Sequence, residues 1–273
     1  MAVNPMDYSG RDTVLDVART ERAKFYNIID NPDNWYVQTR CDEWEVRDIV
    51  GHMIDVTEGY LNGWDMAHRG ETGNALGLVV MGERLNEHAQ AFRSLSREEA
   101  IARLKGDSDK MFAIFDALGP EEWMGSTIPH PYMGPIPTCF YPSFQIIDYG
   151  IHTWDMKWGL GDKFGKLDER TAGILMPYMF IVMQYTVDEE SAKGIDAVFG
   201  IKVDGEWGGQ WRATVKDGQF TCVPADNLDG VQAVFHFKNA SDFVLTTYQR
   251  FPGGETSGDP KVIDQIRHLW FRI

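Results

Sequence analysis

The fold and the candidate site of this chain both depend on residues 144–155, which read F-Q-I-I-D-Y-G-I-H-T-W-D. The apolar residues in this stretch recur at helical spacing and predict an α-helix. Asp148 and His152 are four residues apart, so both project from one face of that helix. A carboxylate and an imidazole placed in this way can provide two ligands to one metal ion.

A third ligand is available from His52, inside the helical pattern V-R-D-I-V-G-H-M-I-D-V at 46–56. His52 shares an apolar stripe with Ile49, and Asp148 also lies among apolar residues. An unpaired imidazole or carboxylate in such surroundings would destabilise the fold, and one metal ion would satisfy both. Three nitrogen or oxygen ligands with an open fourth position are typical of catalytic zinc.

Apolar periodicity predicts four helices before this stretch. They cover residues 14–28, 46–61, 85–95 and 101–118. Asp42 is a candidate N-cap of the second helix, and Ser96 with Glu99 predicts a capping box for the fourth. Residues 125–142 hold five prolines and two glycines, which excludes a helix there. We expect this segment to form a wall or lid over the metal site.

The pattern changes in the last third of the chain. Residues 168–186 predict an apolar helix kinked at Pro177, and beyond residue 191 apolar and polar residues alternate around D-G turns, as in antiparallel strands. Two helices are expected near the end, at 239–248 and 259–271. The fold class is therefore α+β, with a helical bundle at 1–190 and a small α+β domain at 191–273.

Composition limits the classes of partner. The formal net charge of -15 argues against binding to nucleic acid or to an anionic membrane surface. No apolar run reaches transmembrane length, and the N-terminal residues lack signal-peptide features, so a cytoplasmic protein is expected. The three cysteines are dispersed, which predicts reduced thiols rather than a disulfide framework. Cys41, before a helix start, has either a lowered thiol pKa or a plain packing role.

Two further residues are candidates for the site. Asp155 either orients a ligating imidazole or caps its own helix. His130, in the proline-rich segment, is either a general base or a solvated histidine. The chain has no G-x-S-x-G, no Walker A loop and no dinucleotide G-x-G-x-x-G after a strand, which disfavours phosphoryl transfer on a P-loop and hydride transfer with a Rossmann domain.

The segments R-C-D-E-W-E-V-R-D-I-V-G-H-M at 40–53 and D-Y-G-I-H-T-W-D-M at 148–156 resemble the mycothiol-dependent maleylpyruvate isomerase family, within the DinB-like metal-binding bundles. The resemblance implies an up-down helical bundle in which His52, Asp148 and His152 bind one divalent metal ion, with zinc as the first candidate. The family commonly has glutamate at the carboxylate position. Asp148 is therefore a departure that shortens this ligand by one methylene.

The last part of the chain resembles the family's sterol-carrier-like domain, in F-V-L-T-T-Y-Q-R at 243–250 and S-G-D-P-K-V-I-D at 257–264. Arg250 occupies a position similar to that of an arginine that assists catalysis in the family. The resemblance implies a thiol-using isomerase or transferase that acts on a small electrophilic substrate, with mycothiol or a similar thiol as cosubstrate. We expect a monomer or a small homo-oligomer.

Two alternatives remain open at the level of sequence. A metal-dependent hydrolase or lyase would use the same three ligands with water and would need no thiol. A non-catalytic carrier of a small ligand would use the sterol-carrier-like domain and would keep its ligand affinity without the metal ligands.

Overall fold

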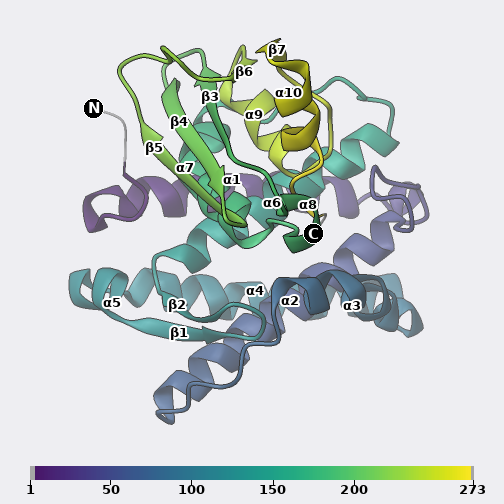
Figure 1. The fold of residues 1–273 in the computed structure, drawn as a ribbon. Coiled ribbons are helices and arrows are strands. Elements are labelled where there is room, and N and C mark those ends of the chain that lie inside the picture. The colour runs from purple at the N-terminus through teal and green to yellow at the C-terminus, as the bar shows by residue number, and fades with distance from the viewer. Residues whose placement is uncertain (1–3, 272–273) are drawn as a thin grey trace. The chain divides into compact units, whose positions relative to one another are not determined.

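The structure, a computed structural model, describes residues 4–271. The chain divides into two compact units that meet in the sequence at Gly165 and Lys166. In Figure 1 the first unit runs from purple to teal and the second from green to yellow. No helix in the described residues is both long and apolar enough to cross a membrane.

The first unit is a helical bundle with one small β-hairpin. Its elements are α1 (Arg11–Ile29), α2 (Val46–His68), α3 (Leu78–Ala91), α4 (Arg97–Ala117), α5 (Pro120–Gly125), β1 (Thr127–His130), β2 (Gly134–Pro137) and α6 (Phe140–Gly159). Helix α1 packs along α6, and α2 packs against α3, α4 and β1. Aromatic side chains fill the core, as where Phe25 of α1 meets Tyr149 of α6 with ring centroids 5.2 Å apart. The bundle therefore places α2 and α6, the two helices with candidate ligands, in one core.

The helix starts follow local capping chemistry. At α4, Ser96 and Glu99 form the predicted capping box. At α2 the predicted cap, Asp42, is wrong: the N-cap is Glu45, whose backbone N–H donates to Asp48 Oδ2 at 2.9 Å. Asp48 is fully buried, and it also accepts two bonds from Arg93. This pairing explains why a carboxylate is tolerated inside the first turn.

The proline-rich segment forms a hairpin rather than an irregular loop. Strand β1 pairs with β2 in antiparallel register, from Thr127 opposite Pro137 to His130 opposite Gly134. The last residues of the expected non-helical segment are helical, because α6 already begins at Phe140. Pro142 then falls in the first turn of α6, where a backbone N–H has no helical partner to lose.

The second unit is a five-stranded sheet with helices. Its elements are α7 (Glu169–Tyr185), α8 (Glu189–Ala192), β3 (Ala197–Val203), β4 (Gly209–Lys216), β5 (Gln219–Pro224), β6 (Ala233–Phe237), α9 (Ala240–Thr247), β7 (Glu255–Gly258) and α10 (Pro260–Arg267). The strand order is β5-β4-β3-β6-β7. Strands β3 and β6 are parallel and the other pairs antiparallel. The predicted D-G turn joins β4 to β5, where Asp217 and Gly218 both have positive φ.

Helix α7 belongs with this sheet by its contacts. It packs against α9, and Phe180 lies 4.9 Å from Trp211 of β4 between ring centroids. Gly173 allows an even closer approach, because a Cβ there would lie 2.1 Å from Trp207. The contacts therefore divide the chain before α7, earlier than the expected boundary at 190/191.

Candidate metal centre

Three side chains predicted as metal ligands meet inside the first unit. Helix α2 provides His52, and α6 provides Asp148 and His152 one helical turn apart. One ligand atom from each of the three lies within 4.8 Å of the other two. Both histidines are buried, and their rings are 4.9 Å apart in an edge-to-face arrangement. The structure thus brings together the predicted set, while metal binding itself stays a prediction.

The surroundings of the Asp148 carboxylate indicate that a cation fits at this position. Its Oδ2 is shielded from solvent and has no hydrogen-bond partner among the described residues. Burial raises the pKa of Asp148 from 3.8 to about 7, and a hydrogen bond from Tyr60 opposes this only in part. A buried acceptor without a donor destabilises a fold unless a cation or a proton compensates it. Two imidazoles and an unsatisfied carboxylate oxygen are a donor set suited to zinc.

Asp155 fixes the orientation of one ligand. Its Oδ2 lies 3.0 Å from Nδ1 of His152, and Asp155 is fully buried. With its Nδ1 proton donated to a carboxylate, His152 has Nε2 left to bind a metal. Of the two roles predicted for Asp155, the contact therefore favours the orienting one.

The side chain of Trp44 covers both imidazoles. Its ring lies 5.0 Å from that of His52 and 5.8 Å from that of His152. Its indole N–H donates to Asn86 Oδ1 at 2.8 Å, which holds the ring in place. An apolar wall of this kind reduces access of water to the ligands.

His130 lies beside the cluster without joining it. It ends β1, and its ring lies 5.8 Å from the ring of Tyr60, the residue that hydrogen-bonds to Asp148. Its Nδ1 accepts the backbone N–H groups of Tyr132 and Met133, at 3.2 and 3.1 Å. Burial lowers the pKa of His130 to about 4. A neutral ring with Nδ1 occupied carries its proton on Nε2, so His130 suits hydrogen-bond donation better than the general-base role expected from the sequence.

The other predicted catalytic residue, Arg250, lies in the second unit. It follows α9 and Gln249, whose φ of 53° is in the left-handed region. Its backbone N–H donates to Leu245 O at 2.9 Å and its Nη1 to Tyr248 O at 3.1 Å. Arg212, another arginine of this unit, donates to Asp229 O. An action of Arg250 at the metal centre stays a prediction.

Three residues near the ligands were not assigned to the site from the sequence. They are Cys41, Trp44 and Tyr60. Cys41 forms a second close group with His152 and Asp155. Trp44 and Cys41 lie within the segment that carries the family resemblance, so the motif gave a signal for them. Tyr60 is eight residues after His52 on α2, and the expected helical pattern did not mark it.

The three predicted ligands lie between two helices, α2 and α6, of a helical bundle. Residues 16–157 match the family described as mycothiol maleylpyruvate isomerase N-terminal domain, and the chain belongs to this family. A comparison with curated protein sequences gave no match.

Solved structures support the fold over most of the chain. A crystal structure of the mycothiol-dependent maleylpyruvate isomerase is similar with a TM-score of 0.62 and 14% identity, over 91% of this chain and 94% of that chain. A histidine-to-alanine mutant of that isomerase gives a TM-score of 0.59 and 13% identity over the same shares. The predicted fold class, a helical bundle followed by a small α+β domain, is confirmed.

Proposed function

We propose that the chain is a divalent-metal-dependent enzyme that activates a low-molecular-weight thiol, with mycothiol as the first candidate. The thiol would serve the isomerisation of a small electrophilic substrate, or be transferred to it. The observation that carries this proposal is the convergence of His52, Asp148 and His152 around a buried carboxylate oxygen without a partner. Membership of the family supports the use of a thiol.

The three ligands would hold one metal ion, with zinc first among the candidates because two imidazoles and a carboxylate suit it. A metal bound there would act as a Lewis acid and lower the pKa of a bound thiol, as a bound cation does for water or cysteine. Residues around the three ligands orient them and shield them from water. Asp155 orients His152, Tyr60 hydrogen-bonds to Asp148, and Trp44 limits access of water.

Substrate binding would involve donors rather than a base. His130, neutral and with its proton on Nε2, would donate to an oxygen of the substrate. We further propose that Arg250 grips a carboxylate of the substrate or of the thiol cosubstrate, since a guanidinium can bind a carboxylate through two parallel hydrogen bonds. The net charge of -15 suits small partners better than large polyanions.

We propose the cytoplasm as the compartment of this reaction. None of the three cysteines, Cys41, Cys139 and Cys222, forms a disulfide bond in the structure. A reducing compartment keeps both such residues and a thiol cosubstrate in the reduced form. For the assembly we propose a monomer or a small homo-oligomer.

The test is a thiol titration of cobalt-substituted protein. Addition of mycothiol or an analogue should produce a sulfur-to-metal charge-transfer band in the wild type. The His152→Ala variant, treated with the same cobalt and thiol, should give none. If millimolar thiol leaves the spectrum of the wild type unchanged, the thiol is not bound at the metal, and a water-based hydrolase or lyase becomes the better proposal.

A further inference from the structure

We infer that Cys41 is a positioning residue for the proposed metal centre, acting through Asp155 on His152. This inference rests on the proposed binding of a metal by His52, Asp148 and His152. The Sγ of Cys41 donates to Asp155 Oδ2 at 3.3 Å, and the same oxygen lies 3.0 Å from His152 Nδ1. Two donors that converge on one carboxylate oxygen hold that carboxylate in a single orientation.

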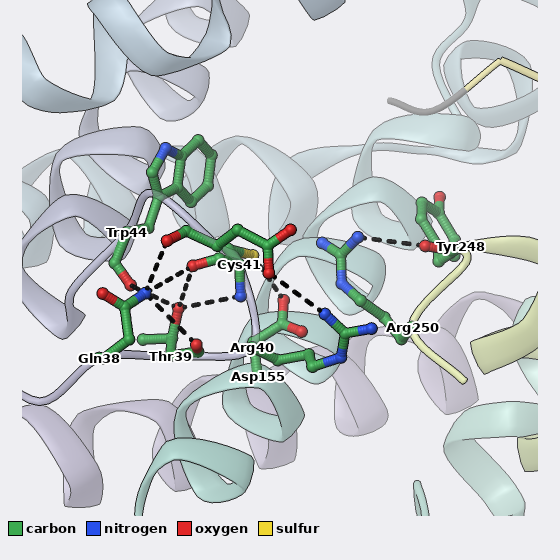
Figure 2. Close-up of polar contacts among 9 residues, drawn as sticks. Gln38, Thr39, Arg40, Cys41, Trp44, Asp155, Tyr248 and Arg250 are labelled. Carbon is green, nitrogen blue, oxygen red and sulfur yellow. Dashed lines mark hydrogen bonds and ion pairs between the residues drawn. The ribbon is translucent and has the colours of Figure 1, made fainter.

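The position of Cys41 is itself fixed by the loop before α2, which Figure 2 shows beside Asp155. Thr39 Oγ1 accepts from the Cys41 N–H at 3.2 Å and donates to Trp44 O at 2.7 Å. The side-chain amide of Gln38 donates to Cys41 O at 2.8 Å and to Trp44 O at 2.9 Å. The same hydrogen bonds of the loop therefore fix the backbone at Cys41, which carries the thiol, and at Trp44, whose ring covers both histidines.

The backbone ties this loop to α6. The N–H of Arg40 donates to Asp155 O at 3.1 Å. Gly159 permits close contact, because a Cβ there would lie 2.1 Å from Gln38 O. Helix α6 carries Asp148, His152 and Asp155. These contacts therefore fix the Cys41 thiol relative to the helix that also carries two of the predicted ligands.

Burial increases the contribution of the hydrogen bond between the Cys41 thiol and Asp155. Cys41, His152 and Asp155 are all buried. A hydrogen bond to a buried charged group contributes more than one in water, and loss of a donor leaves the carboxylate free to rotate away from the imidazole. Partners of a metal-ligating histidine typically influence metal affinity by about 10-fold to 100-fold. Cys41 is one hydrogen bond further from the metal position than Asp155, because it acts on His152 through Asp155. We therefore expect its effect on metal affinity to lie near the lower end of that range.

The experiment is a double-mutant cycle on zinc affinity. Zinc dissociation constants would be measured by competition with a chromogenic chelator for the wild type, Cys41→Ala, Asp155→Asn and the double variant. Cys41→Ala should weaken binding by about tenfold and Asp155→Asn by about 10-fold to 100-fold. The double variant should match Asp155→Asn, because the thiol acts only through the carboxylate. Cys139→Ala, which also removes a buried thiol of the bundle, should bind zinc like the wild type.

A second readout separates positioning from a loss of general stability. The visible spectrum of the cobalt-substituted protein should change in Cys41→Ala and stay unchanged in Cys139→Ala, since it reports ligand geometry. If Cys41→Ala does not fold, Cys41→Ser provides the test: it keeps a donor and should bind zinc more tightly than Asp155→Asn.

Several results would overturn the inference. Independent effects of Cys41→Ala and Asp155→Asn would exclude action through the carboxylate, and so would wild-type affinity in Cys41→Ala. Two zinc equivalents in the wild type that fall to one in Cys41→Ala would make Cys41 a ligand of its own site. If the wild type binds no zinc, the proposed metal centre itself is refuted. If the wild type binds zinc and Cys41→Ala binds it equally well, only the role of Cys41 is refuted.

Discussion

Replacement of His130 by asparagine should remove part of the acid sensitivity of the fold. The ring of His130 is buried, and its Nδ1 accepts two backbone N–H groups. An asparagine Oδ1 can occupy nearly the same place and accept the same bonds, but it does not titrate. The variant therefore separates the protonation of this residue from its structural role.

The magnitude follows from the pKa of His130, which burial lowers from 6.5 to about 4. The unfolded state then binds a proton at pH values where the folded state does not, so the wild type loses stability as the pH falls from about 6.5 to about 4. At 1.36 kcal/mol per pKa unit, the full loss from this one residue is about 3 kcal/mol. Above pH 7 its titration contributes no pH dependence.

The assay is urea unfolding of metal-free wild type and His130→Asn between pH 4 and pH 8. The difference in free energy of unfolding between the two proteins should be constant above pH 7 and should shift by about 3 kcal/mol in favour of the variant toward pH 4. The contributions of other groups are common to both proteins and cancel in this difference. A difference that is flat across the whole range would refute the buried, neutral state of His130.

The remaining predictions concern the ligands, the arginine and the packing of α2. In metal-free wild type, the raised pKa of the Asp148 carboxyl group should make the free energy of unfolding fall as the pH rises from 3.8 to about 7. Asp148→Asn, measured by the same unfolding assay, should not show this fall. Arg250→Lys should reduce turnover by roughly tenfold or more, about 1.4 kcal/mol, with unchanged metal content; full activity would exclude a catalytic role. Gly63→Ala should lower stability by about 1–3 kcal/mol, because its Cβ would lie 2.4 Å from Pro129 O. Gly59→Ala, whose Cβ would have no atom within 4 Å apart from its chain neighbours and the backbone of its own helix, should instead raise the melting temperature through helix propensity.

The parts of the fold that the sequence predicts are those with a regular local signal. Helical spacing brought Asp148 and His152 to one face, and the Asp217-Gly218 turn adopts the positive φ values that such a hairpin requires. The hairpin at 127–137 lacked such a signal, since its prolines remove donors and mask the strand pattern. It forms because β1 packs on α2, which is a tertiary effect.

The surroundings of the ligands were harder to predict for a similar reason. Tyr60 reaches Asp148 from a different helix, and no local pattern records a contact between helices. Cys41 and Asp155 are more than a hundred residues apart in the sequence and meet only when the loop before α2 packs on α6. The boundary of the second unit depends likewise on the packing of α7 against α9, while the composition of the chain changes only after α7.

The most direct test of the account is the metal content of the purified protein and its variants. Elemental analysis after zinc loading and gel filtration should give about one equivalent for the wild type and values near zero for His52→Ala and His152→Ala, because two remaining ligands seldom hold zinc. His88→Ala, which removes a half-buried histidine paired with Asp55, should keep one equivalent. One equivalent of zinc in all three variants would contradict the metal centre.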